Sequence, residues 1–160
     1  MMVLVVADSS SLIALLNIGQ FCLLKKLFTH IIVPPRVAEE VERGENNESP
    51  WFVLLQSGFV QVRTLRADPR LAVLLLQIDP GESEAILLAD QLKLPLLIDD
   101  RAGRRMALDM GLKITGLVGV LEAIKRKGDI SAHKMPEIVA ALESVDFRLS
   151  ADLKKRLLES

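Results

Sequence analysis

The sequence is poor in cysteine, histidine and aromatic side chains. Of its 160 residues, one is cysteine and two are histidine. The lone Cys22 excludes a disulfide within the chain and favours a reducing compartment, and two scattered histidines with one cysteine do not make a zinc site. Aromatic residues contribute 4% although 50% of the residues are hydrophobic. The predicted core therefore consists mostly of leucine, valine and isoleucine.

Long apolar runs and a strong net charge are also lacking. No run approaches the roughly 20 residues that a membrane-spanning helix needs, and residues 1–7 are too short and lack the basic flank of a signal peptide. We therefore expect a cytoplasmic protein without a membrane contact. The net charge of −1 argues against a strongly basic, sequence-blind nucleic-acid binder, although RAGRR and IKRKG are local basic segments.

Apolar strands alternate with helical segments, which is typical of a parallel sheet flanked by helices. We expect strands at 3–7, 30–33, 59–65, 96–98 and 113–115, within one domain over residues 1–160. Residues 79–81 (DPG) are interpreted as a turn before a helix over 82–93. The tail segment 149–158 is amphipathic, and either closes the core or contacts a partner.

Acidic residues follow two of the predicted strands. Asp8 ends the run VLVVA, and Asp99 and Asp100 end LPLLI. Because the carboxyl ends of parallel strands meet at one edge of a sheet, these carboxylates are expected to converge. Helix capping remains an alternative role for Asp8 and Asp100, since a helix follows each.

Two further glutamate positions lie on predicted helices. With a helix period of 100° per residue, Glu40 borders the buried stripe of Val37 and Val41, whereas Glu39 faces water. On the helix predicted over 82–93, the helical phase distinguishes the two glutamates less clearly, because Glu82 and Glu84 both flank the apolar stripe. An acidic residue at a helix N-terminus is also stabilised by the helix dipole without any function.

Converging carboxylates need a counter-charge. Two of them about 4 Å apart repel by roughly 4 kcal/mol at an effective dielectric constant near 20. A cluster of three or four must bind protons, move apart or hold a cation. Oxygen ligands without histidine or cysteine favour Mg²⁺ or Mn²⁺ over zinc.

Five segments, in this order, resemble a known family: VVADSSSLIALLNIG, IIVPPRVAEEV, DPGESEAILLAD, LPLLIDDRAGRRMA and GLKITGLVGVLEAIKRKG. Together they are similar to the PIN domain superfamily, and within it to the DUF3368 group of predicted nucleic-acid-binding proteins. The resemblance covers residues 3–128, and we expect 129–160 to form a helical extension. It implies a three-layer α/β/α sandwich with a mostly parallel central sheet, and a ribonuclease dependent on Mg²⁺ or Mn²⁺.

The resemblance also implies the roles of individual residues. The catalytic set is Asp8, Glu40, Glu84 and Asp100; the metal ligands are Asp8, Glu84 and Asp100, with Asp99 beside them; Ser10 supports Asp8 or a metal-bound water. It is on this resemblance that Glu84 is preferred to Glu82. Glu84 stands where many PIN nucleases have aspartate.

Arginines near the acidic positions are candidates for contacts with RNA phosphates. Arg101 and Arg105 are four apart and share a helix face, and Arg104 and Arg36 are further candidates. The function expected is a metal-dependent endoribonuclease, with the toxin of a toxin–antitoxin pair and a homodimer as implications of the family. The alternative is a PIN-fold module that binds RNA or protein and has a weak or inactive metal site.

Overall fold

A parallel sheet forms the centre of the protein in the computed structural model, which describes residues 2–159. Over this range, five strands are ordered β3-β2-β1-β4-β5 and every pairing is parallel. They are β1 (Leu4–Ala7), β2 (His30–Val33), β3 (Val60–Val62), β4 (Leu96–Leu97) and β5 (Ile114–Thr115). The predicted parallel sheet is confirmed, and its outer strands are shorter than the sequence pattern indicated. The predicted domain ends, residues 1 and 160, lie outside the described range.

Helices connect the strands as the α/β pattern predicted. They are α1 (Ser9–Asn17), a 3₁₀ helix η1 (Phe21–Lys26), α2 (Pro35–Glu42), α3 (Pro50–Gln56), α4 (Arg70–Leu75), α5 (Pro80–Leu92), α6 (Arg101–Asp109), α7 (Leu117–Arg126), α8 (Lys134–Ser144) and α9 (Ala151–Leu158).

The helices make two groups. η1 packs with α1, α3 and α7, whereas α5 packs with α4 and α6; α2 contacts both α1 and α5. Right-handed crossovers place the connections of β1 to β2 and of β3 to β4 on opposite faces of the sheet, because the chain moves in opposite directions across it. The result is the predicted three-layer α/β/α architecture.

The start of α5 differs from the predicted turn. Pro80 and Gly81 belong to the helix, and Asp79 is its N-cap, with Oδ1 accepting a hydrogen bond from the Glu82 backbone N–H at 2.8 Å. Proline is well suited to the first helical position, because a backbone N–H there would have no acceptor within the helix and its absence costs no hydrogen bond. The helix therefore begins two residues before the predicted start at 82.

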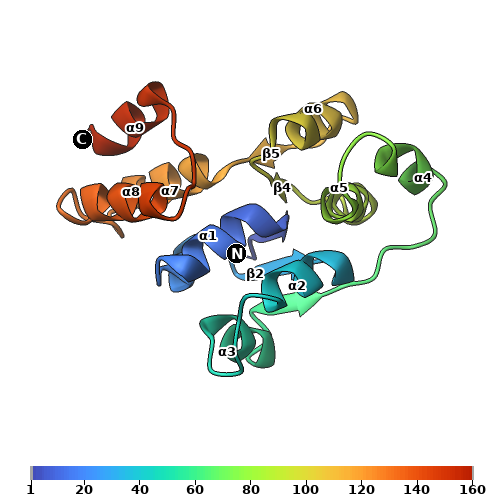
Figure 1. Ribbon diagram of the computed structural model, residues 1–160, viewed down its shortest axis with the longest axis horizontal. Helices are drawn as coiled ribbons and strands as arrows, with labels where there is room; N and C mark the ends of the chain where they lie inside the picture. The colour runs from blue at the N-terminus through green and yellow to red at the C-terminus, as the bar shows by residue number, and fades with distance from the viewer. Residues whose placement is uncertain (1, 160) are drawn as a thin grey trace.

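The C-terminal helices pack against α7 rather than extending freely (Figure 1). The side chain of Leu157 in α9 is fully buried, and Lys125 Nζ in α7 donates to the Leu157 carbonyl at 2.9 Å. Arg156 pairs with Glu122, also in α7. The segment after Gly128 is thus held to the core by both apolar burial and polar contacts.

Replacing Leu157 with alanine should destabilise the whole fold, because it leaves a cavity between α9 and α7. We expect the free energy of unfolding in urea to fall by about 2–5 kcal/mol. The matched control is Leu158→Ala, whose side chain is 45% exposed and whose loss should cost less than about 0.5 kcal/mol. Equal stability of the two variants would show that α9 does not pack as described.

Candidate functional site: an acidic cluster at the carboxyl edge of the sheet

Asp8 lies where the central strand β1 runs into α1. It occupies the N-cap position of α1, yet its side chain makes no capping hydrogen bond. The residue is only 4% exposed, and its Oδ1 has no hydrogen-bond partner in residues 2–159. Capping therefore does not explain why a carboxylate stands here.

Four other carboxylates surround Asp8. The Ser9 hydroxyl donates to Glu40 Oε2 at 2.6 Å, which fixes Glu40 at this edge. Asp79 and Asp100 each cap a helix, α5 and α6, with one oxygen. The acidic cluster, as we call it, consists of Asp8, Glu40, Asp79, Glu82 and Asp100.

Glycines allow the helices around this cluster to approach closely. A Cβ atom at Gly81 would overlap Glu40 Oε1, and one at Gly103 would lie 2.6 Å from Glu82 Oε2. Neither position has room for a larger residue without moving a carboxylate of the cluster. Both glycines therefore belong to the architecture of the site.

Burial and mutual repulsion shift two of the acids. Desolvation, together with the charges of Asp79, Glu40 and Asp100, raises the pKa of Asp8 to about 7 despite a backbone hydrogen bond from Ser9. Desolvation, a hydrogen bond with Asp79 and nearby charges raise the pKa of Glu82 to about 9. Both shifts favour the neutral form, because a charge without a partner is costly in a buried site.

Burial differs among the members of the acidic cluster. Asp8 and Glu82 are buried, Glu40 is partly buried, and Asp79 and Asp100 are exposed. Glu82 Oε2, like Asp8 Oδ1, is buried without a hydrogen-bond partner in residues 2–159. Two buried oxygens of the cluster thus lack a partner within the described residues.

The structure places Glu84 apart from this cluster. Its carboxylate lies 4.0 Å from Arg36 Nε, across the surface between α5 and α2. Glu82, two residues earlier, lies in the cluster instead. The charges of neighbouring carboxylates contribute to the raised pKa values of both Asp8 and Glu82. The geometry thus favours Glu82 over Glu84 as the acidic residue of α5.

Asp99 also points elsewhere. It accepts hydrogen bonds from the Ser11 hydroxyl and from the Leu117 backbone N–H, the latter at 3.0 Å. Desolvation raises its pKa, against the hydrogen bonds and the charge of Arg104, and no other carboxylate contributes. Asp99 is therefore a link between α1, β4 and α7, while its neighbour Asp100 belongs to the acidic cluster.

Of the three serines after Asp8, the outer two hold carboxylates. Ser9 binds Glu40 and Ser11 binds Asp99, and both serines are buried. Ser10, the predicted supporting residue, is exposed on α1.

The four candidate arginines differ in their exposure to solvent and in the contacts that they make. Arg101 and Arg105 are exposed on α6. Arg104 is half-buried and donates through Nη1 to the Ile98 carbonyl at 2.9 Å, and Arg36 faces Glu84. Only Arg101 and Arg105 present unengaged guanidinium groups close to Asp100 in sequence.

The donor chemistry of the cluster fits a hard divalent cation. All its side chains offer carboxylate oxygens, two of them buried and unsatisfied, which suits Mg²⁺ or Mn²⁺. Within residues 2–159, however, no group of three His, Cys, Asp or Glu side chains is already arranged to hold a metal ion. The carboxylates must draw together to bind one, and their mutual repulsion explains why they stand apart without it.

Sequence reasoning missed Asp79, Ser9 and Ser11. An aspartate followed by proline is a recognisable N-cap signal, so Asp79 could have been found from it. The roles of Ser9 and Ser11 depend on partners 31 and 88 residues away, and no local pattern reports such contacts.

Comparison with known proteins decides the family. Residues 4–160 match the family described as DUF3368: PIN domain. The chain belongs to this PIN domain family. PIN domains are typically nucleases, and the match includes the C-terminal helices that the sequence resemblance had left outside. No curated protein matches the chain.

A solved structure shares the PIN fold. The chain is similar to a PilT N-terminus domain protein from the hyperthermophilic archaeon Sulfolobus solfataricus P2, with a TM-score of 0.52 and 16% sequence identity. The similarity covers 76% of this chain and 92% of that one. At this identity the likeness supports the architecture alone. Separately, none of the helices in residues 2–159 is long and apolar enough to cross a membrane.

The PIN domain should lose stability as the pH rises when metal is removed. Asp8 and Glu82 ionise near 3.8 and 4.5 in the unfolded chain but near 7 and 9 in the folded one. Stability is therefore full below the lower pair of values and declines as pH rises through the higher pair. Urea unfolding with EDTA should show a loss of at least about 2 kcal/mol between pH 5 and 9, since one pKa unit is worth about 1.4 kcal/mol.

Asp8→Asn provides the control for this pH dependence. The variant cannot ionise at this position, so its stability should change less between pH 5 and 8 than that of the natural chain. The same slope in both proteins would mean that Asp8 ionises normally.

Proposed function

We propose that this PIN domain is a divalent-metal-dependent endoribonuclease that hydrolyses phosphodiester bonds in single-stranded or structured RNA. The observation that supports it most is the buried carboxylate of Asp8, whose Oδ1 has no partner within residues 2–159, among four other acidic side chains. Such an arrangement is costly for folding, and cation binding is the use that would offset the cost. The family match supports the same reading.

Asp8, Glu82 and Asp100 are the proposed metal ligands, with Glu82 in the role that the sequence had suggested for Glu84. Glu40, fixed by Ser9, and Asp79, fixed at the N-terminus of α5, orient and complete the negative site. Bound Mg²⁺ or Mn²⁺ supplies a polarised phosphate and a bound water of lowered pKa, the two requirements of phosphodiester hydrolysis.

The remaining side chains would position the RNA. Arg101 and Arg105 lie on the exposed face of α6, which begins directly after Asp100. They would contact phosphates on either side of the bond to be cut. Exposed Ser10, at the rim beside Asp8, would contact the RNA or a water molecule.

A second function rests on the protonation of Glu82. Because burial raises the pKa of Glu82 to about 9, this side chain is neutral at pH 7 until a cation displaces its proton. If that displacement is too weak, the domain binds RNA or protein without cutting. Titration calorimetry with Mn²⁺ beside an RNA cleavage assay separates the two functions: binding of RNA without EDTA-sensitive cleavage would favour the binding module.

The biological setting is a further proposal. A toxin role with an antitoxin partner, a homodimer and a cytoplasmic location follow from the resemblance to toxin-type PIN ribonucleases, and they stay predictions.

Asp8→Asn should abolish metal-dependent cleavage while keeping the fold. Loss of an outer-sphere partner of a metal site costs 10–100-fold in activity, so loss of a buried ligand should cost more than about 100-fold. Cleavage of a labelled RNA, with circular dichroism to verify folding, measures both properties. Undiminished cleavage by a pure, folded Asp8→Asn protein would refute the proposed site.

The two glutamates of α5 provide a matched pair. Glu82→Gln should reduce cleavage by more than about 100-fold, whereas Glu84→Gln should change it by less than about threefold, because Glu84 forms only a long, partly exposed ion pair with Arg36. Each variant replaces one carboxyl group of the same helix with an amide of the same size. A larger loss in Glu84→Gln would restore the assignment made from the sequence.

A further inference from the structure

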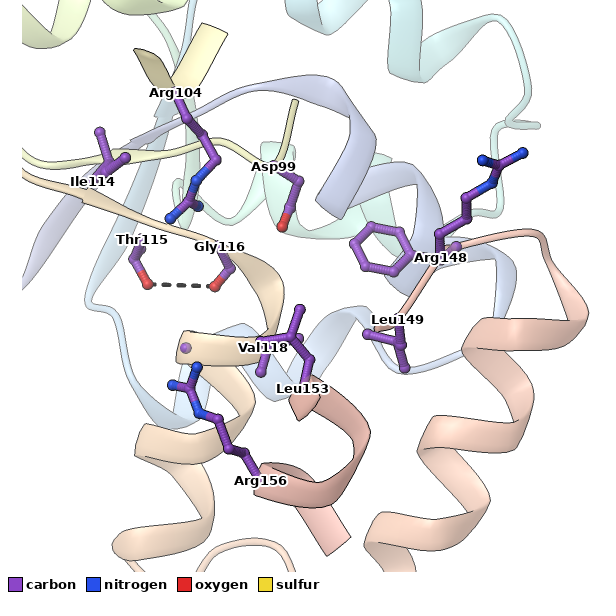
Figure 2. A pocket seen from close by; sticks show the side chains of 12 residues that line it. Asp99, Arg104, Ile114, Thr115, Gly116, Val118, Arg148, Leu149, Leu153 and Arg156 are labelled. Carbon is purple, nitrogen blue, oxygen red and sulfur yellow. Dashed lines mark hydrogen bonds between the residues drawn. The ribbon is translucent and has the colours of Figure 1, made fainter. Parts of the chain in front are cut away.

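A cavity lies at the end of β5, and Asp99, the sequence neighbour of Asp100, is among the residues that line it. It has a volume of about 440 Å³, within the range of about 300–1,000 Å³ typical of small-ligand sites. The end of β5 and the start of α7 form one side, and α9 and the link from α8 form the other (Figure 2). We call it the arginine pocket; it is lined by Asp99, Arg104, Ile114, Thr115, Gly116, Val118, Gly119, Phe147, Arg148, Leu149, Leu153 and Arg156.

The pocket carries an excess of positive charge. Its lining includes three arginines and one aspartate, and the arginines come from α6, from the α8–α9 link and from α9. Arg148 is exposed and takes part in none of the ion pairs found within residues 2–159. Arg156 pairs with Glu122 but keeps a side chain that is 56% exposed.

The aspartate of the pocket does not oppose an anion. Asp99 accepts hydrogen bonds from Ser11 and Leu117, and the guanidinium of Arg104 stands beside it. A Cβ atom at Gly116 would lie 2.7 Å from Asp99 Oδ1 and 2.9 Å from Arg104 Nη1, so glycine is needed for these groups to meet. These hydrogen bonds and Arg104 thus offset part of the negative charge of Asp99.

Part of the pocket lining, contributed by both sides, is apolar. Val118, Leu149 and Leu153 gather there, between Arg104 on one side and Arg156 on the other (Figure 2). Phe147 is partly buried and adds an aromatic ring. The pocket therefore offers both cationic groups and a surface on which a flat ring can lie.

The position of Phe147 is fixed by the end of α8. Phe147 N–H donates to the Leu142 carbonyl at 3.0 Å, and Asp146 N–H to the Glu143 carbonyl at 3.2 Å, which is the Schellman pattern of a helix C-terminus. Asp146 adopts a left-handed φ of 62° to make it. Non-glycine residues rarely adopt that conformation, so the link beside the pocket is a defined structure.

We infer that the arginine pocket binds a nucleotide, with its phosphate at Arg148 and Arg156 and its base against Phe147 and Leu149. Arginine provides charge-assisted hydrogen bonds to phosphate, and bases stack on aromatic side chains. Asp99 lines this pocket while Asp100, the next residue, belongs to the acidic cluster, so a nucleotide here would adjoin the proposed cleavage site. That it belongs to an RNA strand rests on the proposed function; a free nucleotide offers the same chemistry.

Binding can be tested on the full chain without any cleavage. With EDTA present, AMP, hexauridylate and inorganic phosphate are titrated into ¹⁵N-labelled protein, and shifts of backbone amides are recorded by NMR. We expect AMP and hexauridylate to shift amides of 114–119 and 146–153, and Arg148→Ala to weaken both by at least about tenfold. Arg43→Ala, which changes an exposed arginine directly after the end of α2, should leave both affinities unchanged.

Each outcome decides one part of the inference. Tighter binding of hexauridylate than of AMP identifies an RNA strand as the source, and equal binding identifies a free nucleotide. Phe147→Leu keeps an apolar side chain without the ring and should weaken AMP but not phosphate. Equal affinity of Arg148→Ala and the natural chain, or phosphate binding as tightly as AMP, would overturn the inference. Because EDTA prevents metal-dependent cleavage, these results stand even if the nuclease proposal fails.

Discussion

The burial of Asp8 with one carboxylate oxygen, Oδ1, left without a partner within residues 2–159 is the constraint around which this PIN domain is organised. A carboxylate taken out of water must be neutralised by a proton, a cation or hydrogen bonds. Here the central strand carries it to the sheet edge, and the elements that meet there add acidic side chains instead of arginine or lysine. At neutral pH, the raised pKa values of Asp8 (about 7) and Glu82 (about 9) leave part of this negative charge neutralised by protons.

The surrounding structure holds the carboxylates at a fixed spacing. Ser9 fixes Glu40, the N-termini of α5 and α6 take one oxygen each from Asp79 and Asp100, and Gly81 and Gly103 let the helices close in. Most of these contacts join distant parts of the chain. The site therefore exists only once the sheet is complete, which ties its geometry to the stability of the whole domain.

The sequence predicted the parts of this site that depend on strand ends and on helix phase. Asp8 and Asp100 lie at the predicted edge, and Glu40 borders the core of α2 while Glu39 is exposed, as the periodicity of Val37 and Val41 indicated. The distinction between Glu82 and Glu84 could not be drawn in the same way. Helix α5 is buried on nearly all sides, so its pattern has no clear polar face to set the phase.

The exact ends of the short strands expected at 96–98 and 113–115 were not predicted, for a related reason. Strands β4 and β5 have two residues each, and only pairing with neighbours defines where they end. The different orientations of Asp99 and Asp100 also could not be predicted. Asp99 accepts hydrogen bonds from Ser11 and Leu117, which are distant in sequence, whereas Asp100 accepts one from the backbone at the start of α6.

The peptide unit that joins Asp99 and Asp100 thus lies between the acidic cluster and the arginine pocket. The segment 99–100 contributes one side chain to a negative site and the next to a positive pocket. A ligand that shifts this segment from one side changes the free energy of binding on the other, and thermodynamic reciprocity makes the effect equal in both directions. At the junction of β4 with α6, ligands at the two proposed sites would therefore be energetically coupled through the backbone itself.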